Sequence, residues 1–272
     1  MLEQITPLIL TYNEAPNIGR TLERLDWARE IVLVDSLSDD QTLEIVSQFP
    51  QVRVFQRRFD THERQWTFGL KETGIQSQWV LALDADFVLS AELIEEIRQS
   101  EPPDDVAGYQ APFVFYISGR PVRTLCPPLT VLYRRELAEY RQDGHTQKLF
   151  TRGAVRSFSS PILHDDRKPF RRWLQSQRRY AELEAEKLLN TRFPSLDYAD
   201  RIRRLRVIAP LGMLVYCLFV HGSIRDGKAG VFYSTQRMIA EMLLSLMLLE
   251  HDLGIKRPAK MFPGNTGERA AD

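Results

Sequence analysis

Cysteine is scarce in this 272-residue chain, and no apolar run is long enough to cross a membrane. The two cysteines, Cys126 and Cys217, lie far apart, and neither belongs to a CxxC pair or a Cys/His cluster. A disulfide framework and a structural zinc site are therefore not expected, and a reducing cytoplasm fits best. The N-terminus, MLEQITPLIL, has no basic segment followed by a long apolar one, so no signal peptide is predicted.

Charge is balanced over the whole chain but not along it. Residues 1–110 carry 9 Lys and Arg against 20 Asp and Glu, whereas residues 111–272 carry 27 against 16. This asymmetry indicates an anionic partner for the second half, such as phosphate, a membrane surface or nucleic acid. The alternative is that the acidic half docks on the basic half. No nucleic-acid partner is expected, because the basic residues adjoin apolar runs and do not alternate with aromatics.

Apolar strand-like runs alternate with amphipathic helical ones over the first hundred residues. Strands that are apolar at consecutive positions are buried on both faces, as in a parallel sheet covered by helices. The predicted fold class is therefore α/β, with a mostly parallel, Rossmann-like sheet flanked by helices. The expected strands are Ile5–Leu10, Glu30–Asp35, Gln51–Gln56 and Trp79–Asp84, and the expected helices are Pro16–Leu25, Asp40–Phe49, Glu63–Glu72 and Ala91–Gln99.

The rest of the chain has a different pattern. Strands are expected over Val106–Ser118 and Leu129–Arg134, and helices over residues 169–190 and Gln236–Glu250. The predicted division is an α/β domain at 1–165, a basic and apolar helical region at 166–253, and a flexible tail at 254–272.

Polar clusters follow three of the predicted strands. They are Thr11–Glu14, Asp35–Thr42 and Asp84–Asp86, and parallel strands bring such clusters to one edge of the sheet. Asp35 follows a buried strand, so its carboxylate needs hydrogen bonds or a ligand, and a nucleoside beside Asn13 and Ser36 would serve. Asp84 and Asp86 are two residues apart and would point to the same side of an extended strand end. This spacing suits Mg²⁺ or Mn²⁺ bound to a diphosphate.

Four segments together resemble glycosyltransferase family 2 of the GT-A fold. They are ILTYNEAPN (9–17), VLVDSLSDDQT (32–42), RQWTFGLK (64–71) and WVLALDAD (79–86). The resemblance implies a nucleotide-sugar donor, a divalent metal and inversion at the anomeric carbon. It also implies roles for single residues: nucleotide-sugar binding by Thr11, Asn13, Glu14, Asp35, Ser36, Arg64 and Asp84, and metal binding by Asp86.

Two later segments supply further candidates. Residues 140–148 (YRQDGHTQK) stand where inverting members present a catalytic carboxylate, so Asp143 is the first candidate for the base and His145 the second. In the HDDRK run (164–168), His164 is a candidate metal ligand beside Asp84 and Asp86, or it contacts the diphosphate with Arg167 and Lys168.

The apolar run Val207–Val220 is too short to span a bilayer, but it follows four arginines within six positions. It is expected to lie in the plane of an anionic membrane surface, with a buried core or a subunit interface as the alternative. Residues 221–232 (HGSIRDGKAGVF) resemble a turn of bacterial enzymes that build lipopolysaccharide core and related lipid-linked glycans. The predicted location is cytoplasmic, peripheral on the inner face of the cytoplasmic membrane.

The hypothesis is an inverting, metal-dependent, hexosyltransferase-like glycosyltransferase of cell-envelope glycan synthesis. It would use a UDP-sugar and a glycan or lipid-linked acceptor, and a homo-oligomer is left open. The alternatives are a non-catalytic membrane-associated scaffold that keeps the fold, and a nucleotidyltransferase. The latter would need a Gly-rich, basic phosphate loop after the first strand, which TYNEAPN does not provide.

Overall fold

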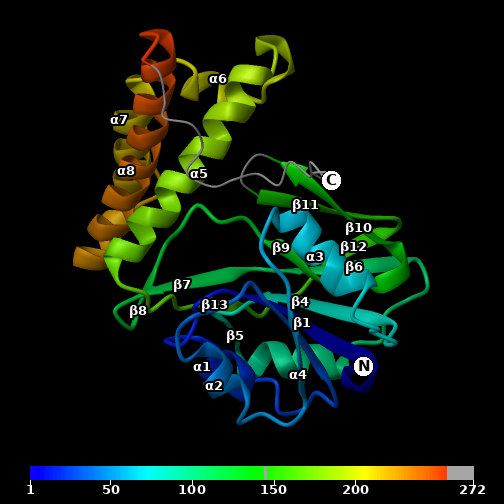
Figure 1. The fold of residues 1–272 in the computed structure, drawn as a ribbon. Helices are drawn as coiled ribbons and strands as arrows, with labels where there is room; N and C mark the ends of the chain where they lie inside the picture. Colours follow the sequence, from blue (N-terminus) through cyan, green and yellow to red (C-terminus); the bar gives the residue numbers. More distant parts are fainter. Residues whose placement is uncertain (144–145, 256–272) are drawn as a thin grey trace, which may run out of the picture.

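The fold is organised around a twisted central sheet with a bundle of helices at one side (Figure 1). It was obtained as a computed structural model that describes residues 1–143 and 146–255. Within these residues the central sheet has seven strands in the order β12-β6-β9-β4-β1-β2-β3. The strands are β1 (Ile5–Thr11), β2 (Ile31–Asp35), β3 (Val52–Gln56), β4 (Trp79–Asp84), β6 (Val106–Ala111), β9 (Leu129–Arg134) and β12 (Ala154–Ser157).

The first four of these strands run parallel, as the continuous apolar runs predict. β1 lies between β2 and β4, β2 pairs with β3, and β9 runs antiparallel to both β4 and β6. The largely parallel α/β architecture predicted from the sequence is therefore confirmed. The register sets Thr11 opposite Asp35 and Leu10 opposite Asp84, so the carboxyl ends of β1, β2 and β4 meet.

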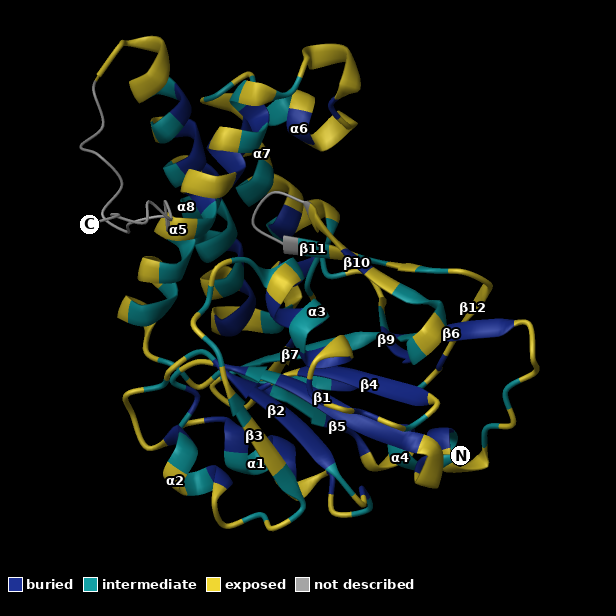
Figure 2. Ribbon diagram, turned by 45° about the vertical axis from the view of Figure 1, so that its right-hand side comes forward, coloured by how far each residue is buried: buried dark blue, intermediate teal, exposed yellow. Residues whose placement is uncertain are grey.

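Each face of the sheet buries its own hydrophobic cluster. Alternate strand residues such as Ile9 and Leu33 pack with α1 (Ile18–Glu23), α2 (Thr42–Val46) and α4 (Ala91–Gln99). The residues between them, such as Leu8 and Val32, pack with Trp66 of α3 (His62–Lys71) on the other face. Because both faces are covered, the central strands β1, β2 and β4 are buried along most of their length, whereas edge strands β3 and β12 are largely exposed (Figure 2).

The predicted strand Val106–Ser118 is wrong, because the structure divides it into two strands of different sheets. β6 ends at Ala111 and β7 (Phe113–Ile117) begins after Pro112, which has no N–H to continue a ladder. The carbonyl of Pro112 instead accepts from the N–H of Ile162 at 2.9 Å. The second sheet has the order β5-β13-β7-β8, with β5 (Phe87–Leu89), β8 (Arg120–Val122) and β13 (Ile162–His164).

A hairpin lies over the α3 face of the central sheet. It consists of β10 (Ala138–Asp143) and β11 (Thr146–Thr151), which pair antiparallel after the short helix η2 (Arg135–Leu137). Tyr140 of β10 stacks on Trp66 of α3 with ring centroids 5.6 Å apart, and its hydroxyl shares a 2.8 Å hydrogen bond with that of Tyr133. The hairpin is thereby fixed beside the end of β4.

The chain after β13 is helical. α5 (Phe170–Asn190) packs along α8 (Gly227–Asp252), and α7 (Ile208–Val215) packs on the other side of α8 (Figure 1). The predicted helix Gln236–Glu250 is shorter than the observed α8. Its first turns were not predicted because Gly230 and Ser234 interrupt their apolar pattern. The shorter elements are η1 (Leu2–Gln4), η3 (Phe193–Ser195), α6 (Tyr198–Arg203), the π-helix η4 (Tyr216–Val220) and η5 (Ser223–Asp226).

The strands extend as far as His164 and the helical part begins at Phe170, on either side of the predicted boundary at residue 165. Most of the predicted tail, residues 256–272, lies outside the described residues.

Candidate active site

The loops that follow β1 and β2 are tied together by hydrogen bonds. The backbone N–H of Asn13 donates to the Ser38 hydroxyl at 2.8 Å, and that of Glu14 donates to the Thr42 hydroxyl at 2.7 Å. Asn13 has φ 56°, a conformation that Asn tolerates better than most residues. The two loops therefore form one rigid rim beside the end of β4.

Two of the predicted nucleotide-binding residues lie within this rim. Asp35 is completely buried, and its carboxylate accepts from the Ser38 N–H at 3.0 Å, from the Ser38 hydroxyl and from the Gln56 amide at 3.2 Å. Thr11 is also buried, and its hydroxyl has no hydrogen-bond partner among the residues that the structure describes. Asp35 thus fixes the loop shape, while the Thr11 hydroxyl retains an unused polar atom at the strand end.

Three carboxylates from distant parts of the chain meet next to this rim. Glu14 follows β1, Asp86 lies in the turn between β4 and β5, and Asp166 follows β13. One carboxylate oxygen of each lies within 4.8 Å of the others. Three carboxylates at such separations repel unless a cation lies among them. An all-oxygen donor set of this kind suits Mg²⁺ or Mn²⁺. We call Glu14, Asp86 and Asp166 the carboxylate cluster.

The cation that the structure places among them is the ammonium of Lys168. Its Nζ lies 2.6 Å from Glu14 Oε1, 3.6 Å from Asp166 Oδ1 and 3.9 Å from Asp86 Oδ2. Burial lowers the pKa of Lys168, but Asp86, Glu14 and Asp166 outweigh this and raise it above its ordinary value. Lys168 is therefore charged at neutral pH. Burial and Asp86 raise the pKa of Glu14, against the opposing effects of Lys168 and Asn17.

Asn17 connects the cluster to the segment that carries Asp166. Its side chain is fully buried, and its Nδ2 donates to Glu14 Oε2 at 2.8 Å and to Asp166 Oδ1 at 3.1 Å. Its Oδ1 accepts from the Arg167 N–H at 3.0 Å and from Arg20 Nη2 at 2.8 Å. One amide thus orients two of the three carboxylates.

His164 and Asp84 lie near the cluster. His164 stacks on Phe115 with ring centroids 4.2 Å apart, and its Nε2 lies 3.5 Å from Asp86 Oδ2. Asp84 is the last residue of β4 and is exposed at the surface, although the surrounding protein limits the hydration of its carboxylate. That loss of hydration, together with Asp86 and Glu14, raises the pKa of Asp84 to about 7.

The remaining predicted residues lie further out. Arg64, on the first turn of α3, is largely exposed and pairs with Asp60 at 3.4 Å. The Ser36 hydroxyl accepts from Gln65 Nε2 at 3.0 Å. The exposed guanidinium of Arg167 pairs with Asp165 at 2.9 Å.

Of the two candidates for the catalytic base, one lies among the described residues. Asp143 is the last residue of β10, and its backbone pairs with Thr146. His145 lies outside the described residues.

Sequence reasoning did not assign the carboxylate cluster as it stands. It placed Glu14 at the nucleotide and gave Asn17 and Asp166 no role. The signal for Asn17 was its place in the ILTYNEAPN segment, and the signal for Asp166 was its neighbour His164. Tyr180 of α5 was also missed, and burial and the negative charge of Asp84 raise its pKa.

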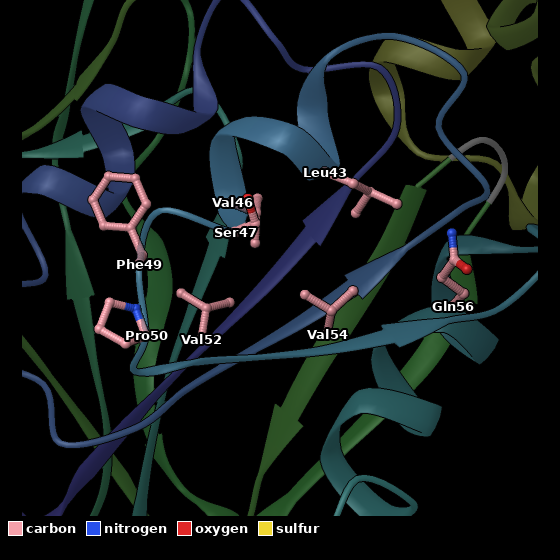
Figure 3. Close-up of a pocket in the computed structure, with 8 residues that line it drawn as sticks. All are labelled: Leu43, Val46, Ser47, Phe49, Pro50, Val52, Val54 and Gln56. Atoms are coloured by element: carbon pink, nitrogen blue, oxygen red, sulfur yellow. The ribbon is translucent and has the colours of Figure 1, made fainter.

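A surface hollow between α2 and β3 has no such chemistry. Figure 3 shows that its lining is mainly apolar, and β3 is the edge strand, two positions from β1. The lining residues are Leu43, Val46, Ser47, Phe49, Pro50, Val52, Val54 and Gln56. None of them carries a charge, so the candidate site is the carboxylate cluster.

A parallel α/β sheet with a carboxylate cluster outside its strand ends defines a ligand-binding domain suited to a divalent cation and its phosphate partners. The chain belongs to glycosyl transferase family 2, since the family model "Glycosyl transferase family 2" matches residues 8–172. The resemblance seen in the sequence is therefore confirmed at the level of the family.

Named relatives are similar to part of the chain. An uncharacterized glycosyltransferase of Rickettsia felis is 30% identical over 146 residues, which are 51% of this chain and 50% of that protein. One from Rickettsia bellii is 32% identical over 114 residues, 40% of this chain and 38% of that protein. The chain spans about half or less of the length of these relatives.

Solved structures that superpose on this chain include S. aureus TarS 1-349 in complex with UDP-GlcNAc. It is 16% identical, with a TM-score of 0.47, and the match covers 97% of this chain and 98% of that one. Another is glucosyl-3-phosphoglycerate synthase from Mycobacterium tuberculosis in complex with Mn²⁺, UDP and phosphoglyceric acid. It is 13% identical, with a TM-score of 0.43, and the match covers 66% of this chain and 76% of that one.

Proposed function

We propose that the protein is an inverting glycosyltransferase that moves a sugar from a nucleotide sugar, expected to be a UDP-sugar, to a hydroxyl of a glycan or lipid-linked acceptor. Its place would be cell-envelope glycan synthesis. The observation that carries the proposal is the carboxylate cluster outside the ends of β1 and β4, where an open α/β sheet binds its ligand. Membership of the family supports the same reaction class.

The cluster fits a divalent cation. Its donors are three carboxylates of suitable separation, and Lys168 demonstrates that a positive charge is favourable at their centre. Glu14, Asp86 and Asp166 would hold the ion. When bound, Mg²⁺ or Mn²⁺ would supply positive charge that stabilises the departing diphosphate.

The neighbouring residues have roles that follow from their positions. The Thr11 hydroxyl has an unused donor and acceptor for the nucleotide, and the rim of Asn13 and Ser38 shapes the nucleoside side of the site. His164 lies beside Asp86 and is placed to adjust its orientation. Asp143 remains the proposed base, since the backbone of its hairpin is fixed on α3 beside the end of β4.

The test compares Asp86→Asn with the matched control Asp104→Asn, which changes an exposed carboxylate just before the start of β6, at the end of the sheet opposite the carboxyl end of β4. Both variants and the unchanged protein are offered a panel of sugar nucleotides with Mn²⁺, and transfer and hydrolysis are measured. Asp86→Asn is expected to lose at least about a hundredfold in turnover, because it replaces a charged carboxylate ligand next to the diphosphate with a neutral amide. Asp104→Asn is expected to keep normal turnover.

Three results would speak against the proposal. Normal turnover of Asp86→Asn would remove the metal assignment. Nucleotide binding without transfer to any acceptor would favour a scaffold that keeps the fold. Release of pyrophosphate from a nucleoside triphosphate would identify a nucleotidyltransferase.

We further propose that the helical region attaches the protein to the anionic inner face of the cytoplasmic membrane. Seven exposed apolar residues lie along one side of α7 and η4, at the i, i+4 spacing of a helix face. They are Val207, Ile208, Leu211, Val215, Tyr216, Phe219 and Val220. We call them the α7 face, and a continuous exposed apolar face of this kind supports an interaction role.

Charges at both ends of the α7 face favour a membrane over a second protein subunit. Arg201 and Arg204 precede the face, and the exposed Arg225 and Lys228 follow it. Such flanking cations are attracted to anionic lipid headgroups.

Two of the four arginines predicted to face the membrane instead form ion pairs within the protein, so the prediction is wrong for these two. Arg203 pairs with Glu241 at 3.0 Å and with Asp200 at 2.9 Å, and Arg206 pairs with Asp252 at 2.7 Å. Among the described residues, no single helix has the length and apolar content needed to span a membrane. The pair Ile208–Val220 and Ser223–Asp252, bent by 70°, meets those criteria together.

Flotation with anionic vesicles tests this attachment. Phe219→Glu places a charge in the α7 face, and Val54→Glu places the same charge at an exposed apolar position on edge strand β3. Phe219→Glu is expected to lower vesicle binding at least about tenfold, because the charge must enter the interface, and Val54→Glu is expected to bind normally. Equal flotation of both variants would remove the assignment, and dimerisation lost with Phe219→Glu would identify a subunit interface instead.

A further inference from the structure

Lys168 occupies a position that the reaction outlined above does not explain. Its ammonium lies within 4 Å of all three members of the carboxylate cluster, closest to Glu14 at 2.6 Å. The side chain is largely buried, with 17% of its surface exposed. A lysine so placed occupies the space in which a cation bound by the same carboxylates would lie.

The backbone of Lys168 is fixed, whereas its side chain can move. The N–H of Lys168 donates to Asp166 Oδ1 at 3.0 Å, the preceding N–H of Arg167 donates to Asn17 Oδ1 at 3.0 Å, and α5 begins two residues later. The ammonium, however, stands at the end of a flexible four-carbon stem. It can therefore leave the cluster without any displacement of the strand or helix on either side.

Charge balance indicates when it would leave. Three carboxylates and one ammonium leave a net negative charge, which attracts a divalent ion. Two cations about 4 Å apart near a protein surface repel each other more strongly than they would in bulk water. Binding of a divalent ion would therefore expel the ammonium. A diphosphate bound to that ion would then be the nearest anion to accept it.

We propose that Lys168 is a tethered counter-ion that neutralises the carboxylate cluster in the metal-free protein and moves onto the diphosphate of a bound nucleotide when a divalent metal takes its place. The inference rests on the proposed function for the identity of the ligand, a nucleoside diphosphate group. In the absence of nucleotide, Lys168 would compete with the metal for the carboxylate cluster. Once the metal is bound, Lys168 would strengthen the binding of the nucleotide. These two roles have opposite signs and can be separated.

The experiment measures Mn²⁺ binding to the full chain without nucleotide, by the electron paramagnetic resonance signal of free Mn²⁺. Lys168→Met keeps the apolar stem and removes the charge, so Mn²⁺ is expected to bind at least about tenfold more tightly than to the unchanged protein. Lys168→Arg keeps the charge and is expected to stay near the unchanged affinity. Lys71→Met removes an exposed lysine of α3 and serves as the control.

The second measurement is UDP binding at saturating Mn²⁺. Lys168→Met is expected to bind UDP about tenfold more weakly, because a charged hydrogen bond to phosphate is lost. Lys71→Met is expected to bind Mn²⁺ in the first measurement and UDP in the second as the unchanged protein does. Circular dichroism and the Tm of each variant establish that it is folded.

Any of three other outcomes would overturn the proposal. Unchanged or weaker Mn²⁺ binding by folded Lys168→Met excludes competition with the metal. If no variant binds Mn²⁺ while UDP binding still requires Lys168, the lysine permanently replaces the metal. If Mn²⁺ binds more tightly and UDP binding is unaffected, Lys168 does not reach the diphosphate. Neither binding measurement depends on sugar transfer, so failure of the proposed function would be recognised separately.

Discussion

Asn17 offers a direct test of how the site is assembled. Its buried amide makes four hydrogen bonds, two donated to Glu14 and Asp166 and two accepted from Arg20 and the Arg167 N–H. Each such bond contributes about 1 kcal/mol net, and each buried partner left without a bond costs a similar amount or more. Asn17→Ala should therefore lower the free energy of unfolding by about 2–4 kcal/mol.

The same substitution should weaken Mn²⁺ binding by about 10–100-fold, because the side chains that orient metal ligands typically have effects of this size. A role confined to stability would not change Mn²⁺ affinity, so both quantities need to be measured on folded protein. The control is Asn190→Ala at the exposed end of α5, for which a change within about 0.5 kcal/mol is expected. Asn17→Ala variants that match this control in unfolding and in Mn²⁺ affinity would refute the reasoning.

The remaining predictions concern pH and packing. Because the pKa of Asp84 is raised to about 7, this carboxyl is protonated in the metal-free protein at lower pH, and it favours the fold there. That contribution is lost as the pH rises through about 7. Mn²⁺ favours the ionised form, so its affinity should rise between about pH 5 and 7 with release of a proton. Calorimetry in two buffers checks this, and an affinity independent of pH would contradict it. Gly230→Ala should destabilise the protein by at least about 2 kcal/mol, since a Cβ would lie 1.7 Å from the Ser223 carbonyl oxygen. Gly212→Ala, with nothing within 4 Å of its Cβ, should be neutral or stabilising by up to about 1 kcal/mol in the same unfolding assay.

The first half of the fold could be predicted because its signals are local. β1, β2 and β4 are apolar at consecutive positions and end where polar loops begin, which fixes both their burial and their direction toward the site. The strand predicted at Val106–Ser118 failed for an equally local reason. A continuous apolar run does not reveal that Pro112 ends one sheet and that the next strand joins another.

The site could be predicted only in part, since one of its segments arrives by a long-range pairing. Glu14 and Asp86 follow β1 and β4, so the sheet alone brings them near each other. Asp166 and Lys168 reach them because β13 enters the second sheet between β5 and β7. No pattern within residues 161–168 specifies that pairing, which is why the HDDRK run predicted a role for His164 at the metal or the diphosphate but none for Asp166.

The charge asymmetry along the chain gains a physical meaning from the same arrangement. The two sources proposed for it, an anionic ligand and contact between an acidic and a basic half, meet at one place. Lys168 of the second half pairs with Glu14 of the first, and Arg172 of α5 donates to the Tyr12 carbonyl at 3.0 Å. A diphosphate that enters between α5 and the strand ends would meet cations from the second half, while its metal would meet two carboxylates from the first half and one, Asp166, from the second. Two ligands of opposite charge that bind together require such a pair of surfaces, and neither surface alone would hold both.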